Sequence, residues 1–256
     1  MSVVAYRRRG ALRASVGAEI TRIRTGRGLL VAASACPLIA AITTVGPLQS
    51  VPPAALQADP EAWRLLSTAT VGAGPALVLG FLSLAGDHRH RGLGAEVAAT
   101  GRRDVVLAGR VLVALAAGLV VGVVAAAAAL AALVLWYAAV GASTAVLLPG
   151  GWLPMAGGVL ASGLAAVVGL ALAVLGRCRT WVLVLALLWY FVGEAVLPGP
   201  LPDVARWTPG GAVTALGTSV TPWGLDFGAG LALLAGWTAF ALVLARSSLT
   251  RWELRP

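Results

Sequence analysis

Lysine is absent from this 256-residue chain, so all 19 of its basic residues are arginine. Without lysine, the sequence cannot contain a Walker-A phosphate loop, a lysine Schiff base or a lysine general base. Its two cysteines are Cys36, in an apolar run, and Cys178, in a short arginine-flanked turn, and they provide no disulfide framework. These absences exclude several common catalytic devices from this sequence.

Charge is also scarce. Only 11% of the residues are charged and 59% are hydrophobic, and the mean hydropathy is +0.89. Soluble domains carry about 25% charged residues, so this composition indicates a protein that lies in lipid.

Six apolar runs divide the sequence, and a helix needs about 20 residues to span the hydrocarbon core. The third run has about 36 residues, roughly 54 Å as a helix, so its first ten or so residues should project into the cytoplasm. Trp136 and Tyr137 should mark its outer interface. We therefore predict an all-α polytopic membrane protein with six transmembrane helices. The runs are about Gly28–Val45, Trp63–Leu84, Val105–Val140, Gly151–Leu175, Trp181–Leu197 and Leu225–Leu244.

Small and polar residues within the runs have packing roles. In the second run, Gly72 and Gly74 should allow close helix approach, and Pro75 should kink the span. Serines such as Ser83 and Ser162 have no histidine partner at a suggestive spacing. We expect them to bond a carbonyl of the preceding turn rather than to act as nucleophiles.

Residues 1–27 carry seven arginines. Leu12, Val16, Ile20 and Ile23 recur at spacings that place them on one helical face. The pattern predicts an amphipathic helix lying in the membrane surface. A solvated basic tail is the alternative interpretation.

The arginines also predict the orientation. With the N-terminus inside, 17 of the 19 arginines lie in cytoplasmic segments, and only Arg64 and Arg206 lie outside. The positive-inside rule favours this topology, with both termini cytoplasmic in the cell inner (plasma) membrane. Residues 1–256 then form one transmembrane domain, with six spans over 28–246 and a cytoplasmic tail over 247–256. Segments 49–60 and 198–223 are expected to be external.

The search for reactive groups is mostly negative. His88 and His90 are two residues apart, but the neighbouring arginines would repel a cation, so a charged docking surface is favoured over a metal site. Topology explains the basic residues, so no nucleic-acid binding is expected. Glu194 lies near the outer end of the fifth run. Burial there would be costly, so it either caps that end of the span or lines a substrate path.

The charged island Asp87–Arg110 reads D-H-R-H-R-G … T-G-R-R … G-R. It resembles the inner loop of the type-2 ABC exporter permeases (the ABC-2 type transporter permease family), which commonly reads E-Y-R-H-G-T … T-P-R-R … A-K. Arg91-Gly92 stands where the family has Gly-Thr, which is a departure from the pattern. The resemblance assigns Asp87, Arg89, His90, Thr100, Arg102, Arg103 and Arg110 to coupling with an ATPase. Leu93 and Val97 recur with Thr100 at spacings of four and three, which predicts an apolar docking edge in the same loop, and Glu96 is counted with them.

This resemblance implies a permease that hydrolyses nothing itself. It would pair with a second permease copy, as a homodimer, on two copies of a separate ABC-type ATP-binding subunit. It would export a drug, an antibiotic peptide or a lipid-like substrate, as antibiotic resistance or immunity proteins do, and it needs no cofactor. The segment Arg206–Leu216 resembles the family's outer segment, a short re-entrant helical pair before the last span.

Two other classes remain open. A non-transporting membrane scaffold would not need the charged island to engage an ATPase. A secondary transporter should show inverted repeats and polar residues near the bilayer midplane, and the apolar runs contain almost no charged residue.

Overall fold

The computed structural model describes residues 16–17, 21, 27–50, 52, 70–89, 103–144, 151–217 and 225–251. Every regular element in these ranges is helical, so the predicted all-α class is confirmed. The elements are α2 (Arg27–Val45), η1 (Gly46–Ser50), α4 (Ala73–Arg89), α6 (Arg103–Ala139), α7 (Trp152–Leu175), α8 (Thr180–Leu188), the π-helical turn η4 (Trp189–Gly193), α9 (Glu194–Val196), α10 (Pro202–Ala205), α11 (Pro209–Gly217) and α12 (Phe227–Arg251).

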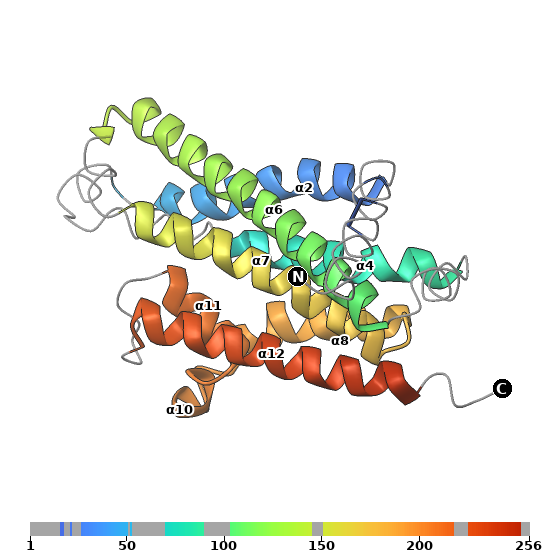
Figure 1. Ribbon diagram of the computed structural model, residues 1–256. Helices are drawn as coiled ribbons and strands as arrows, with labels where there is room; N and C mark the ends of the chain where they lie inside the picture. The colour runs from blue at the N-terminus through green and yellow to red at the C-terminus, as the bar shows by residue number, and fades with distance from the viewer. Residues whose placement is uncertain are drawn as a thin grey trace, which may run out of the picture.

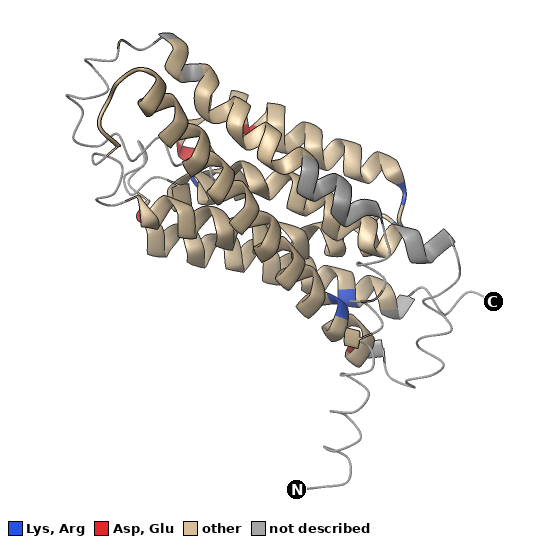
Figure 2. Cartoon of the chain, turned by 90° about the horizontal axis from the view of Figure 1, so that it is seen from above, with Lys and Arg blue, Asp and Glu red and all other residues tan. Residues whose placement is uncertain are grey.

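Three of the described helices are long and apolar enough to cross a membrane. They cover Asp104–Ala139, Trp152–Leu175 and Phe227–Leu249. Shorter apolar helical stretches cover Ala35–Val45 and Thr70–Ala85, and a third covers Thr180–Val196. The chain therefore has the helices of a membrane protein, and Figure 2 shows few charged residues along the parts of the bundle that the structure describes.

The long helices run roughly side by side, so their ends gather at two ends of the bundle (Figure 1). One end holds the start of α6, the turn between α7 and α8, and the last turns of α12. We call it the arginine end, because Arg177 and Arg179 lie in that turn and Arg246 lies near the end of α12. There the Arg246 Nε atom lies 3.2 Å from the Asp104 Oδ1 atom. The opposite end holds α11 and the start of α12.

Helix α7 forms the centre of the bundle (Figure 1), and 13 of its 24 residues are buried. It packs against α4 through glycines on both helices. A Cβ atom at Gly80 would collide with the Ala166 carbonyl, and one at Gly169 would collide with the Leu77 carbonyl. Without a hydrophobic drive in lipid, such close backbone contact supplies the packing energy between helices.

The small residues of the second run behave as the sequence predicts. A Cβ atom at Gly72 would lie 2.7 Å from the Ser162 Oγ atom, so the helices approach closely at this position. The hydroxyls of Ser83 and Ser162 donate to carbonyls of the preceding turn, at 2.7 and 2.8 Å. The kink expected at Pro75 lacks its usual cause, because α4 begins at Ala73 and a proline in the first turn breaks no helical hydrogen bond.

Some boundaries and placements differ from the expectation. Helix α12 continues to Arg251, about two turns beyond the predicted end at Leu244. Tyr137 is fully buried in a cluster with Leu48 and Leu133, against which Trp136 also packs, and the membrane interface that the two aromatic residues should mark stays a prediction. Leu48 of η1 belongs to this cluster with Leu133 and Tyr137 of α6.

Most of the N-terminal segment, with its predicted amphipathic helix, lies outside the described residues, apart from helical positions 16–17, 21 and 27. Most of segment 49–60, residues 90–102 and the tail beyond 251 also lie outside them.

Candidate functional site

The best-defined polar site lies around Glu194, where α8 ends through the π-helical turn η4. Such π turns widen the helix locally and often occur at functional sites. Glu194 begins the short helix α9 directly after this turn. The turn brings its carboxylate back onto the Trp189 side chain and onto the start of α11.

Three donors satisfy the Glu194 carboxylate. Its Oε1 atom accepts from the Trp189 indole N–H and from the Gly210 backbone N–H, both at 3.0 Å. Its Oε2 atom lies 2.6 Å from the Thr208 hydroxyl oxygen. Hydrogen bonds to an ionised acceptor are about twice as strong as neutral ones, so this carboxylate ties the fifth apolar segment to the segment that follows it.

Thr208 is also the cap of α11. Its Oγ1 atom accepts the Gly211 backbone N–H at 3.1 Å and lies 2.7 Å from the Ala205 carbonyl oxygen. A hydroxyl has one proton, so Glu194 and Ala205 are alternative acceptors for it. The partial positive charge at the start of α11 further stabilises the nearby carboxylate.

A cavity of about 360 Å³ lies beside this network. Side chains from four parts of the chain form its walls, and most of them are apolar or carry a hydroxyl. The carboxylate is the charged group in the lining. The walls include Ile39 and Thr43 of α2, Val71, Phe191 of η4, Glu194 and Thr214 of α11. The volume suits a small organic molecule with an apolar body.

The sequence left two alternatives open for Glu194, an acid that caps the outer end of its span and a carboxylate that lines a substrate path, and both stay predictions. Its hydrogen bonds hold the start of α11, as an end-capping acid would, and it also lines a cavity. Among the other predicted site residues, Arg110 is the one whose side chain the structure describes, and it does not line this cavity. A substrate path here remains a prediction.

The residues predicted to couple to an ATPase lie at the arginine end or outside the described residues. The backbones of Asp87 and Arg89 form the end of α4, and Arg103 begins α6. Nothing further is described of these three side chains. The residues that lie outside the described ranges are His90, Leu93, Glu96, Val97, Thr100 and Arg102.

Arg110 is placed differently from the rest of the island. Its side chain is 2% exposed, on the same inward face of α6 as Val106, Val113 and Ala114. Val106 lies four residues before Arg110, and Val113 and Ala114 lie three and four residues after it, so these positions share one helical stripe. The bundle itself covers Arg110, so its guanidinium is held within the chain's own packing.

Sequence reasoning missed the partners of Glu194. Thr208 directly before Pro209 is a typical helix start, with a capping hydroxyl followed by proline at the first helical position. That signal predicts α11. No sequence signal points to Trp189 as a donor, because a five-residue spacing brings two side chains together only in a π-helical turn.

Within the described ranges, no three His, Cys, Asp or Glu side chains gather as a metal site would require. No family model, curated protein or solved structure matches this chain.

Proposed function

We propose that this chain is the membrane-spanning permease subunit of an ATP-driven ABC exporter, with ATP hydrolysis supplied by a separate ATP-binding subunit. The observation that carries the proposal is the charged island Asp87–Arg110, whose sequence resembles the coupling loop of type-2 exporter permeases. In support, α4 leads into the island and α6 leads out of it at the arginine end.

In this proposal the bundle crosses the membrane six times. The three long helices each cross once, and the remaining crossings belong to α2, to α4 and to the continuous segment Thr180–Val196. The arginine end is cytoplasmic under the positive-inside rule, and both termini lie on that side.

Helices α10 and α11 form the re-entrant outer pair of the proposal. Two short helices in the segment before α12 support it, and so does the burial of α11, which contacts α7 and α12. Its buried residues are Gly211, Ala212, Val213, Ala215, Leu216 and Gly217.

The active unit is proposed to contain two permease copies on two ATP-binding subunits. Helix α2 offers a face for the second copy. Cys36 and Ala40 are buried against the chain's own helices, whereas Leu38 and Ile42 are 62% and 61% exposed. The cargo, a drug, an antibiotic peptide or a lipid-like molecule, would pass near the Glu194 cavity on leaving.

Affinity purification of the full chain from its own membranes tests the proposal. We expect an ATP-binding subunit to copurify and the complex to hydrolyse ATP, with stimulation by cargo. If no ATP-binding subunit copurifies, the result would favour a non-transporting membrane scaffold instead. Uptake driven by an ion gradient without ATP would favour a secondary transporter.

A further inference from the structure

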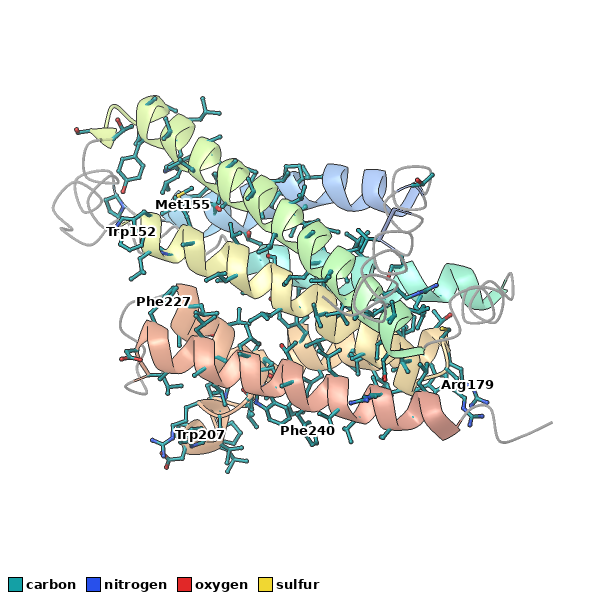
Figure 3. The ribbon with its side chains drawn as sticks, in the orientation of Figure 1. Trp152, Met155, Arg179, Trp207, Phe227 and Phe240 are labelled. Carbon is teal, nitrogen blue, oxygen red and sulfur yellow. The ribbon has the colours of Figure 1, made fainter. Side chains whose placement is uncertain are left out.

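A second and larger cavity lies at the arginine end, between the last turn of α7 and the first turns of α8. Its volume is about 610 Å³, within the range of small-molecule sites. The walls are aliphatic, and Gly176, two arginines and a tryptophan complete the lining. The wall residues are Leu172, Leu175, Val182, Leu185 and Ala186, and the others are Arg177, Arg179 and Trp181. Figure 3 shows Arg179 at the end of the bundle far from Trp152 and Phe227.

The turn that holds the two arginines has a fixed backbone. The Cys178 N–H donates to the Ala173 carbonyl at 2.8 Å, and the Arg177 N–H donates to the Val174 carbonyl at 3.2 Å. These two bonds are those of a Schellman motif, which ends a helix with one residue in the left-handed conformation. Arg177 occupies that position with a φ of 50°, and Cys178 follows with a φ of 56°.

Glycine is the residue that the left-handed position favours, because it has no Cβ atom to strain the backbone. The fold of this turn therefore does not require an arginine at position 177. Its side chain is exposed and lines the cavity. The left-handed backbone conformation disfavours an arginine at position 177. Binding of a ligand by its guanidinium would explain why an arginine is there.

The start of α8 adds positive charge to the same place. Arg179 is the N-cap of this nine-residue helix, and its side chain makes no capping hydrogen bond. The first N–H groups of a helix carry partial positive charge, and a cationic cap residue opposes that charge. The two guanidinium groups and the helix N-terminus all carry positive charge and repel one another. An anion bound between them would offset that repulsion.

The walls of the cavity decide which anion fits. They are aliphatic, and α8 continues them as an exposed apolar surface. Val184 is 57% exposed, Leu185 is 54% exposed and Leu188 is 55% exposed. Trp181, 56% exposed, is of the residue type that lies at headgroup level in membranes. A free phosphate would contact the arginines but leave the aliphatic walls uncovered. A phospholipid would contact the arginines with its phosphate and the walls with its acyl chain.

We propose that the cavity between α7 and α8 binds one anionic phospholipid, with its phosphate against Arg177, Arg179 and the start of α8. Its acyl chain would lie along the aliphatic wall. This site requires no ATPase partner, so it stands or falls separately from the proposed transport function.

The full chain in nanodiscs tests this inference. Discs of phosphatidylcholine alone are compared with discs that also contain phosphatidylglycerol, and native mass spectrometry counts the lipids retained on the released protein. We expect the wild type to retain one phosphatidylglycerol. Arg177→Gly and Arg179→Gln should each weaken that retention by about tenfold, the loss expected for one charge-assisted hydrogen bond. Arg206→Gln, at the opposite end, is the matched control and should retain the lipid.

Arg177→Gly also separates binding from folding. Because glycine suits the left-handed position, this variant should unfold at a higher temperature than the wild type in phosphatidylcholine discs, although it loses the lipid. Retention of phosphatidylglycerol by Arg177→Gly and Arg179→Gln at the wild-type level would overturn the proposal. Stabilisation of the protein by inorganic phosphate as strong as that by the lipid would reduce the site to an anion site and overturn its lipid part.

Discussion

The Thr208 hydroxyl oxygen lies 2.6 Å from the Glu194 Oε2 atom, and this contact joins the end of the fifth apolar segment to the start of α11. The same hydroxyl accepts the Gly211 backbone N–H, so one side chain serves both the carboxylate and the helix cap. The placement of the Glu194 carboxylate and the start of α11 therefore depend on the same Thr208 side chain. Loss of either side chain should loosen α11 from its place against α7 and α12.

Thr208→Val tests that linkage. It removes a helix cap and a hydrogen bond to a carboxylate, which together should cost about 1–3 kcal/mol of stability. We expect a lower unfolding temperature in detergent and faster hydrogen exchange at the amides of Gly210 and Gly211. Thr238→Val is the control, because the Thr238 hydroxyl donates only one turn back, to the Leu234 carbonyl at 2.8 Å. Equal behaviour of the two variants would contradict the role assigned to Thr208.

Gly210 is required for the carboxylate to reach α11. A Cβ atom at this position would collide with the Glu194 carboxyl group. Gly210→Ala should therefore displace Glu194, break its bond to the backbone N–H and destabilise the protein by about 1–3 kcal/mol. Gly199→Ala, where the nearest atom would lie 3.5 Å away, should have little effect. Thermal unfolding of the two variants side by side measures the difference.

Gly169 tests the crossing of α4 and α7. An added methyl group would meet the Leu77 carbonyl, which is backbone and cannot rotate away. The helices would have to separate, so Gly169→Ala should cost about 1–3 kcal/mol and larger side chains should cost more. Gly236→Ala in α12 adds the same methyl group to open space and should be neutral. A Gly169→Ala protein as stable as the wild type would show that this contact does not hold the bundle.

Helices were the part of the fold that the sequence predicted best, because long apolar runs have one stable form in lipid. The predicted run Gly151–Leu175 matches α7 almost residue for residue. The way in which the helices pack against one another could not be predicted from the sequence. The inward face of α6 holds Arg110, and only the packing of α6 against its neighbours shows that this face is buried.

The Glu194 site was predicted only in part. A carboxylate within an apolar run signals an unusual environment, and that signal was sound. Its partners come from residues 5, 14 and 16 positions away. Because a π-helical turn and a helix start bring them together, no regular periodicity in the sequence reveals them.

Cysteine labelling tests the proposed topology. In a variant without Cys36 and Cys178, an impermeant thiol reagent added to intact cells should label a cysteine at position 203. Asp203 is 91% exposed at its side chain, on the side proposed to be external. A cysteine in place of Glu96 should react only after the cells are opened. Labelling of Glu96→Cys from outside would overturn the topology, and the position 203 variant confirms in the same experiment that the reagent works.

The charged island provides the test of coupling. Leu93, Val97 and Thr100 recur at spacings of four and three, so a helix formed in the island would have an apolar edge for docking. Val97→Asp would place an unpaired charge in that contact, at a cost of roughly 2–5 kcal/mol. We expect the Val97→Asp variant to insert normally in the membrane. It should no longer bind the ATP-binding subunit, and transport-coupled ATP hydrolysis should be lost.

A second change addresses the arginines of the same island. Arg102→Ala combined with Arg103→Ala removes two cations that could pair with carboxylates of the partner, so association should weaken and depend less on salt. Arg206→Ala, at the opposite end of the bundle, is the matched control. If the arginines serve only to hold the membrane surface, the double variant should keep its partner and lose only insertion efficiency. Normal partner binding and transport in both the Val97 and the double arginine variants would show that the coupling element lies elsewhere in the chain.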